Sequence, residues 1–294
     1  MQTVGRFAPS PSGRMHLGNV LCALLAWLSA RHQNGAFLLR IEDLDAMRCP
    51  RSYADLIMDD LRWLGLDWDG EVPYQSERAP IYEKYEQILR EKGLLYPCFC
   101  SRAALHAASA PHLSDGRVLY AGTCRELTPA EIEEKRKKRA PATRVRVPDE
   151  IISFTDGVFG AYSENLAEEC GDFIIRRSDG VFAYQLAVTV DDGLSGVTEV
   201  VRGSDLISST PRQIWLYRLF GFEPPHFVHI PLLCDVDGRR LSKRDEDLDL
   251  GLLRERFTPE QVIGALAFAA HLTDRAEPAS VRELVQDFDW SRIP

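Results

Sequence analysis

The sequence predicts an α/β fold, in which a Rossmann-type nucleotide-binding parallel sheet carries a zinc-containing insertion and ends in a short helical C-terminal segment. Over the first 95 residues, short apolar runs alternate with helical patterns. This alternation is typical of a parallel sheet with crossover helices. From residue 96 cysteines cluster and Pro and Gly recur, and strand character returns near residue 173. We therefore expect a nucleotide-binding fold split by an insertion.

The first half of this fold is expected in residues 1–95. Residues 4–8 and 37–41 are predicted to be strands. The stretch 17–30 is apolar nearly all round, which indicates a buried helix. Two amphipathic helices are expected at 52–64 and 81–92.

The remaining chain divides into three parts. The insertion, 96–172, is predicted to hold a charged helix at 129–139 and strands at 143–147 and 151–155. Strands at 173–177 and 184–191 and a helix at 211–220 are expected in the second half of the catalytic domain, 173–245. Residues 246–294 read as helical, with apolar groups at 262–270 and 281–285.

Composition narrows the class of protein. With 294 residues, 45% apolar and 27% charged, the chain resembles an ordinary globular protein. It has no apolar run long enough to span a membrane and no secretory signal, so we expect a cytoplasmic protein. The net charge of −9 does not indicate a nucleic-acid binder, but residues 245–294 carry eleven acids against five arginines. That segment is thus −6 and the rest only −3, so RNA could dock on the N-terminal body.

Two motifs indicate ATP chemistry. Residues 6–19 read RFAPSPSGRMHLGN, and residues 239–245 read RRLSKRD. Gly18 lets a nucleotide approach the backbone, and His16 beside a helix N-terminus can donate to a phosphate. Lys243 would reach the phosphates, and Ser242 would help to hold its loop. Each motif alone is more often a turn or a solvated basic loop; their order and spacing favour catalytic roles for His16, Gly18, Ser242 and Lys243.

Together the motifs resemble the two ATP-handling signatures of class I aminoacyl-tRNA synthetases, with HLGN for the HIGH-type motif and LSKR for the KMSKS-type loop. The segments RFAPSPSGRMHLGN…LLRIEDLD and YQLAVTVDD…GVTEVVRGSDLISSTPRQIWLY resemble the glutamyl/glutaminyl branch of that family. Asn19 and Leu241 depart from the usual histidine and methionine. The resemblance implies activation of an amino acid as its adenylate with ATP and Mg²⁺.

The resemblance also implies a glutamate pocket. Arg6 and Arg202 would contact substrate carboxylate, since a guanidinium can offer a carboxylate two bonds. Glu42 would bind the α-ammonium, and Ser10 and Tyr184 would hydrogen-bond around it. As an alternative, Arg6 and Glu42 form a structural ion pair at the sheet edge. Asp191 and Asp192 would serve the ribose or the pocket wall, or else cap a turn.

A cysteine cluster in the insertion predicts one structural zinc ion. Cys98, Cys100 and Cys124 place three thiols within 27 positions, and thiolates suit zinc. On chemistry alone His106 or His112 would be the fourth ligand. The family resemblance implies Tyr120 instead, in the element YAGTC. Unpaired cysteines in an irregular loop are the alternative.

The length beyond the basic loop bears on the RNA substrate. About 50 residues follow Lys243, where an ordinary glutamyl-tRNA synthetase carries anticodon-reading domains, so 246–294 would be a truncated stem-contact-like segment. The whole chain resembles the short members of this branch, which implies activation of L-glutamate without tRNA and its transfer to queuosine in the anticodon loop of tRNA(Asp). Charging of a tRNA 3′ end with a separate anticodon-binding partner is the alternative, as is a non-catalytic paralogue that binds glutamate or RNA. We expect a monomer, and we interpret the run 135–139 (KRKKR) as a solvated helix face.

Overall fold

The computed structural model describes residues 2–101, 119–233 and 249–294. Nine strands occur in these ranges: β1 (Val4–Phe7), β2 (Ala36–Leu39), β3 (Leu95–Cys98), β4 (Ala142–Val145), β5 (Ile151–Asp156), β6 (Gly160–Asn165), β7 (Phe173–Arg176), β8 (Glu199–Gly203) and β9 (His226–Ile230). The α-helices there are α1 (Leu17–His32), α2 (Arg51–Trp63), α3 (Ala79–Glu91), α5 (Pro129–Arg136), α6 (Tyr184–Leu194), α7 (Thr210–Phe220), α8 (Leu250–Arg256), α9 (Pro259–Ala269) and α10 (Val281–Leu284).

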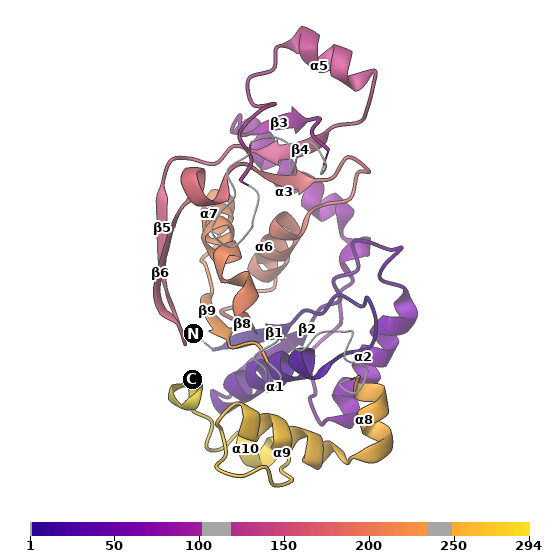
Figure 1. The fold of residues 1–294 in the computed structure, drawn as a ribbon, viewed down its shortest axis with the longest axis vertical. Helices are drawn as coiled ribbons and strands as arrows, with labels where there is room; N and C mark the ends of the chain where they lie inside the picture. Colours follow the sequence, from indigo (N-terminus) through magenta and orange to yellow (C-terminus); the bar gives the residue numbers. More distant parts are fainter. Residues whose placement is uncertain (1, 102–118, 234–248) are drawn as a thin grey trace.

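Two parallel strand pairs form the nucleotide-binding part of the fold. β1 pairs with β2, and β8 pairs with β9. The two pairs lie side by side, because the Thr198 N–H just before β8 donates to the carbonyl oxygen of Val4 in β1 at 2.9 Å. The apolar helix α1 covers these strands (Figure 1), and its residues from Val20 to Ala30 are buried, except Cys22. The expected parallel arrangement is therefore found in these four strands, although the sequence analysis assigned no strand to 199–203.

The sheets of the whole molecule are mixed, which corrects the expectation of one parallel sheet. β3, β4 and β7 form an antiparallel sheet in the order β3-β4-β7, and β5 with β6 forms an antiparallel hairpin. Figure 1 places the first of these sheets with α5 at the far end of the molecule from α8 and α9. The strand β7 thus joins residues 173–176 to strands of the predicted insertion.

One predicted element is wrong. Residues 184–191 were expected as a strand, but they form most of helix α6. The β-branched run Val188, Thr189 and Val190 favours a strand locally. In the folded protein all three are buried, and the Thr189 hydroxyl donates to the Gln185 carbonyl one turn earlier, at 2.8 Å. Packing on several sides therefore overrides local propensity.

Smaller differences concern boundaries. The charged helix ends at Arg136 rather than at residue 139. The sequence interpretation also assigned no strands to 95–98, 160–165 and 199–203. In the described part of the chain, no helix is long and apolar enough to cross a membrane.

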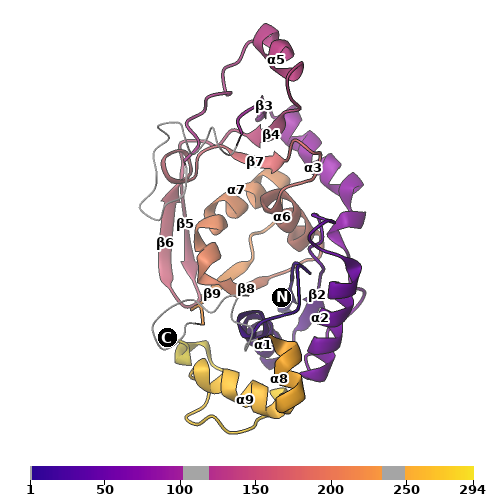
Figure 2. The ribbon, with the colours of Figure 1, turned by 45° about the vertical axis from the view of Figure 1, so that its right-hand side comes forward.

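Two large hydrophobic cores stabilise the part of the fold that carries the parallel strands. The first joins α1 and the β1 and β2 strands to the C-terminal helices, through residues such as Leu24, Phe37 and Ile263. The second lies among α3, α6 and α7 and includes Tyr82 and Leu186. Figure 2 shows α6 and α7 between the sheet of β3, β4 and β7 and the strands β8 and β9.

Candidate active site

A cavity of about 420 Å³ opens beyond the carboxyl ends of β1, β8 and β9, next to the N-terminus of α1. This is where parallel sheets bind ligands. Its lining includes every predicted catalytic or glutamate-binding residue that the structure describes: Arg6, Ser10, His16, Gly18, Glu42, Tyr184 and Arg202. The structure therefore brings together residues that lie up to 196 positions apart in the chain.

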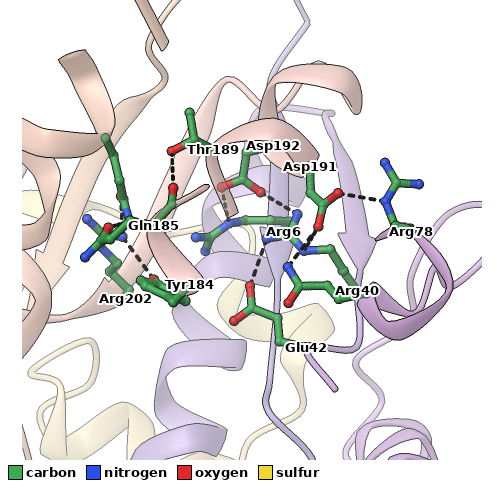
Figure 3. Close-up of polar contacts among 12 residues, drawn as sticks. Arg6, Arg40, Glu42, Arg78, Tyr184, Gln185, Thr189, Asp191, Asp192 and Arg202 are labelled. Atoms are coloured by element: carbon green, nitrogen blue, oxygen red, sulfur yellow. Dashed lines mark hydrogen bonds and ion pairs between the residues drawn. The ribbon is translucent and has the colours of Figure 1, made fainter. Parts of the chain in front are cut away.

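Arg6 at one wall is fixed from behind by a buried aspartate. Its Nε donates to Asp192 Oδ2 at 3.4 Å (Figure 3), and its Nη1 donates to the Val201 carbonyl at 3.2 Å. The same Asp192 accepts a hydrogen bond from Arg40 Nη1 at 2.6 Å, and Arg40 Nη2 donates to Glu42 Oε1 at 3.0 Å. Arg6 and Glu42 thus pair with different partners, not with each other as one alternative supposed.

Burial decides how these groups ionise. Burial raises the pKa of Glu42 above its ordinary value, although the Arg40 guanidinium opposes the shift. Burial also opposes ionisation of Asp192, but Arg40 and then Arg6 outweigh it and lower the pKa of Asp192. The ionised form of Glu42 is therefore disfavoured relative to that of Asp192. A cation bound next to Glu42 would stabilise its ionised form.

The side chain of Asp191 points away from that of Asp192, toward α3 and the segment before it. It accepts hydrogen bonds from Gln75 Nε2 at 2.8 Å, Arg78 Nε at 2.7 Å and Tyr82 Oη at 2.8 Å. Both aspartates are buried within α6, so their side chains support the pocket wall, and neither caps a turn.

Arg202 is a buried cation held by neutral groups. Its Nε donates to His229 Nε2 at 3.0 Å, its Nη2 to Thr210 Oγ1 at 2.7 Å, and its Nη1 to Gln213 Oε1 at 2.8 Å. A longer bond of 3.4 Å joins Nη1 to the Tyr184 hydroxyl. Among the described residues no carboxylate forms an ion pair with Arg202, and burial, with Arg6 nearby, lowers its pKa. An anion bound in the cavity would therefore supply the counter-charge that this buried guanidinium lacks.

His16 forms the cap of α1. The ring Nδ1 of His16 accepts a hydrogen bond from the backbone N–H of Gly18 at 3.1 Å, and the backbone N–H of His16 donates to Asn19 Oδ1 at 3.3 Å. In a neutral imidazole whose Nδ1 accepts, the proton lies on Nε2. A Cβ at Gly18 would lie 3.0 Å from His16 Cε1, so glycine leaves room for this ring position. Asn19, which departs from the family motif, thus completes the helix cap.

Ser242 and Lys243 lie outside the described residues. The residues on either side of the gap, Leu233 and Asp249, are described, and Leu233 lines the cavity. Asp249 forms an antiparallel bridge with His16, and the Leu250 N–H donates to the Met15 carbonyl at 3.1 Å. The chain therefore leaves the described region at the cavity and re-enters it beside His16.

The three predicted cysteine ligands come together at the β3 end of the insertion. The Sγ atoms of Cys98, Cys100 and Cys124 all lie within 4.8 Å of one another, and Cys100 Sγ is 3.7 Å from Cys124 Sγ. Tetrahedral zinc–thiolate bonds of about 2.3 Å place sulfur atoms about 3.8 Å apart, so the donor set fits zinc. Burial opposes ionisation of Cys98, but the nearby Arg144 guanidinium outweighs it and lowers the pKa of this thiol.

Tyr120, the fourth ligand that the family resemblance implies, lies next to this cluster. Its hydroxyl lies 3.6 Å from Cys98 Sγ and accepts the Cys124 N–H at 2.8 Å. The Arg144 guanidinium lies 3.8 Å above its ring. The alternative ligands His106 and His112 lie outside the described residues.

Arg40 and the histidine at position 229 were missed at the sequence level. A signal for Arg40 exists, because a lone arginine in the apolar strand FLLRI must find a buried partner. The Asp191–Asp192 pair within an otherwise apolar stretch carries the same signal. Nothing local marks His229, whose partners Asp156 and Arg202 lie 73 and 27 positions away.

Comparison with known proteins agrees with this geometry. Residues 2–286 match the family model of tRNA synthetases class I (E and Q), catalytic domain. A glutamyl-Q tRNA(Asp) synthetase of Symbiobacterium thermophilum is 50% identical, over 99% of this chain and 93% of its own. A protein of the same name from Nitratidesulfovibrio vulgaris is 47% identical, with the same coverage of both chains.

A solved structure has a similar fold at lower sequence identity. The glutamate tRNA ligase of Elizabethkingia meningosepticum, solved in complex with its amino acid, superposes with a TM-score of 0.84 at 29% identity. The match covers 100% of this chain but 66% of that chain, so this chain spans just under two thirds of its length.

Proposed function

Because this chain belongs to the class I tRNA synthetases of the E and Q type, among relatives named glutamyl-Q tRNA(Asp) synthetase, we propose that it activates L-glutamate with ATP and transfers the glutamyl group to queuosine in tRNA(Asp). It is an enzyme of the ligase type. The observation that carries the proposal is the convergence of Arg6, Glu42, Arg202 and His16 on one cavity.

The pocket suits an acidic amino acid. Arg202 lacks a carboxylate partner among the described residues, so a substrate carboxylate would supply the missing counter-charge. Arg6 would contact substrate carboxylate as well, while Asp192 keeps its guanidinium in place. The α-ammonium would bind Glu42, whose raised pKa an added cation would offset. Ser10 and Tyr184 line the same cavity and would hydrogen-bond to the substrate.

Activation needs position and positive charge rather than a covalent intermediate. A carboxylate oxygen of glutamate attacks the α-phosphorus of ATP, the bond from that phosphorus to the bridging oxygen breaks, and pyrophosphate leaves with the electron pair. The Nε2–H of His16 would donate to phosphate oxygens beside the N-terminus of α1. Lys243, in a loop with Ser242, would neutralise charge on the leaving pyrophosphate. Mg²⁺ would enter with ATP as part of that substrate.

A structural zinc ion would hold the insertion. Cys98, Cys100 and Cys124 supply three sulfur donors at suitable spacing, and Tyr120 is the fourth ligand that we propose. When bound, the ion would cross-link β3 to the segment near residue 124, which α5 follows. It would take no part in glutamate activation, since the cluster does not line the cavity.

The acceptor is argued from the relatives. Two of them, at 50% and 47% identity and 93% coverage of their own chains, are named glutamyl-Q tRNA(Asp) synthetase. We propose that the adenylate forms in the absence of tRNA and that a hydroxyl of queuosine then attacks the glutamyl carbonyl, which releases AMP.

The test of activation is glutamate-dependent exchange of labelled pyrophosphate into ATP, measured without tRNA. We expect exchange with L-glutamate and none with L-glutamine, which lacks the side-chain charge. Exchange that requires added tRNA would favour an enzyme that charges a tRNA 3′ end. No exchange under either condition would leave only a non-catalytic glutamate- or RNA-binding role.

A further inference from the structure

Behind the glutamate cavity lies a buried dyad of Asp156 and His229. His229 is fully buried in β9, and Asp156, at the end of β5, is 3% exposed. His229 Nδ1 lies 2.6 Å from Asp156 Oδ2. The opposite ring nitrogen, Nε2, lies 3.0 Å from Arg202 Nε. The three side chains thus form a line from the β5–β6 hairpin to the cavity wall.

The partners of the ring determine its tautomer. An arginine Nε–H is always a donor, so His229 Nε2 must accept. The proton of the neutral ring then lies on Nδ1 and is donated to the Asp156 carboxylate. Burial lowers the pKa of His229, and the positive charge of Arg202 acts in the same direction. The ring is therefore neutral and presents a lone pair to Arg202.

Asp156 is itself held by donors only. Its Oδ1 accepts the N–H groups of Val158 and Phe159, both at 3.0 Å, and that of His229 at 3.2 Å. Its Oδ2 accepts His229 Nδ1–H and, at 3.1 Å, the His229 backbone N–H. Burial opposes ionisation of this carboxyl, but His229 and the backbone donors lower its pKa. Neither oxygen faces another acceptor, so a carboxylate is the group that satisfies every partner.

We propose that Asp156 and His229 are positioning residues, which set the orientation of the Arg202 guanidinium and thereby the affinity for the substrate carboxylate. The inference rests on the proposed role of Arg202 in glutamate binding. With Nε fixed by His229 and the far edge fixed by Thr210 and Gln213, the guanidinium plane cannot rotate without breaking a buried hydrogen bond. Preorganisation of this kind lowers the entropic cost of binding.

Asp156→Asn is the informative variant because it replaces one acceptor oxygen by an NH₂ donor and changes little else. The amide oxygen should stay at the Oδ1 position, where three N–H groups converge, which leaves the NH₂ group facing His229 Nδ1. His229 Nδ1 would then have to accept, and the ring proton would move to Nε2. The Nε2–H of His229 would face the Nε–H of Arg202, so two donors would lie opposite each other. The same logic of a wrong tautomer applies when an aspartate that orients a histidine is replaced by asparagine.

The tautomer can be measured directly. Long-range ¹H–¹⁵N correlation spectra of the wild-type protein should contain a histidine signal with Nδ1 protonated and Nε2 unprotonated that is absent in His229→Gln, which assigns it to His229. In Asp156→Asn that signal should change to the Nε2–H pattern. A wild-type His229 that is an imidazolium or an Nε2–H tautomer would overturn the inference, whatever the enzyme activates.

Kinetics then separate positioning from folding. In pyrophosphate exchange, Asp156→Asn should raise the KM for glutamate about tenfold to hundredfold, the loss expected for one buried hydrogen bond to a charged group, and leave the KM for ATP unchanged. His229→Gln keeps an oxygen acceptor and should retain more glutamate affinity than His229→Leu. The control is His226→Gln on the same strand, whose partner Glu199 lies away from the cavity lining.

The outcomes distinguish two failures. If the wild-type protein exchanges pyrophosphate with glutamate but Asp156→Asn keeps its glutamate KM, the positioning role is wrong and the proposed function stands. If the wild-type protein shows the Nδ1–H tautomer but no glutamate-dependent exchange, the proposed function fails. An equal rise in the KM values for both substrates would indicate general distortion and would also contradict the positioning role.

Discussion

Arg40 Nη1 donates to Asp192 Oδ1 over 2.6 Å, and both side chains are buried although 152 positions separate them. This bond joins Arg40, the residue after β2, to α6. Arg40 also donates to Glu42, and Asp192 also accepts from Arg6, so both residues of the pair contact a residue that lines the cavity. A buried pair of this kind costs desolvation, so its value lies in fixing geometry.

Removing one partner of the pair should be strongly destabilising. Asp192→Ala leaves Arg40 and Arg6 without their shared counter-charge, and we expect the free energy of unfolding to fall by about 3–5 kcal/mol. Urea denaturation followed by circular dichroism measures this. The matched control is Glu77→Ala, which breaks the exposed pair with Arg51 at 2.8 Å and should cost less than about 1 kcal/mol. Equal effects of the two substitutions would contradict the central role of Asp192.

The same carboxylate predicts a pH dependence of stability. Because Arg40 and Arg6 lower the pKa of Asp192 against its burial, the folded state binds this proton less tightly than the unfolded chain. Its stabilisation is complete above the ordinary aspartate pKa of about 3.9 and is lost as the pH falls through that value toward the folded pKa. Urea midpoints of wild type and Asp192→Asn, compared across this range, should converge as the pH falls. A constant difference would show that the charge of Asp192 is not responsible.

Glu42→Gln should separate stability from function. Since burial raises the pKa of Glu42, its ionised form is disfavoured in the folded protein, and the amide should leave stability at neutral pH unchanged or slightly higher. Loss of the carboxylate should raise the KM for glutamate at least about tenfold, as expected for a hydrogen bond to a charged group. Pyrophosphate exchange and urea denaturation of one preparation measure both. An unchanged KM would remove Glu42 from ammonium recognition.

Lys243→Ala should slow adenylation by orders of magnitude and leave the fold intact, because a cation that meets charge developing on the phosphates acts in the transition state. The measurement is the rate of glutamate-dependent pyrophosphate exchange at saturating substrates. Lys92→Ala, at the exposed end of α3, is the control for loss of a surface lysine. Near-normal exchange in Lys243→Ala would exclude this lysine from the mechanism.

Metal analysis of the purified protein should give about one zinc ion per chain, and Cys124→Ser should lose it. The insertion should then lose protection from proteolysis while the α1 core remains protected, because the cluster packs with Tyr96 and Phe99 and not with the main core. Cys22→Ser, far from the cluster and packed against the main core, is the control. A stable, metal-free wild-type protein would contradict the zinc proposal.

Much of the N-terminal fold could be predicted from sequence because its signals are local. The apolar helix α1 and its flanking strands follow from uninterrupted apolar runs and a turn of Pro and Gly. Helix α6 could not be predicted in this way, because its β-branched residues favour a strand and its helical state depends on burial among distant elements. Local propensity and tertiary packing disagree there, and packing decides.

The site residues likewise fall into those that the sequence could identify and those that only the folded structure reveals. Arg6, Glu42, Tyr184 and Arg202 were identified by family resemblance, and the structure places all four at one cavity. Asp156 and His229, which hold Arg202 from behind, could not be identified, because a buried positioning residue has no motif of its own and is recognised only through its contacts.

The proposed acceptor is tested most directly by transfer of labelled glutamate to tRNA(Asp) with and without queuosine. The account predicts label only on the queuosine-containing tRNA, and retention of that label on the anticodon stem-loop fragment after nuclease cleavage. Label of equal extent on both tRNAs, located at the 3′ end, would contradict it.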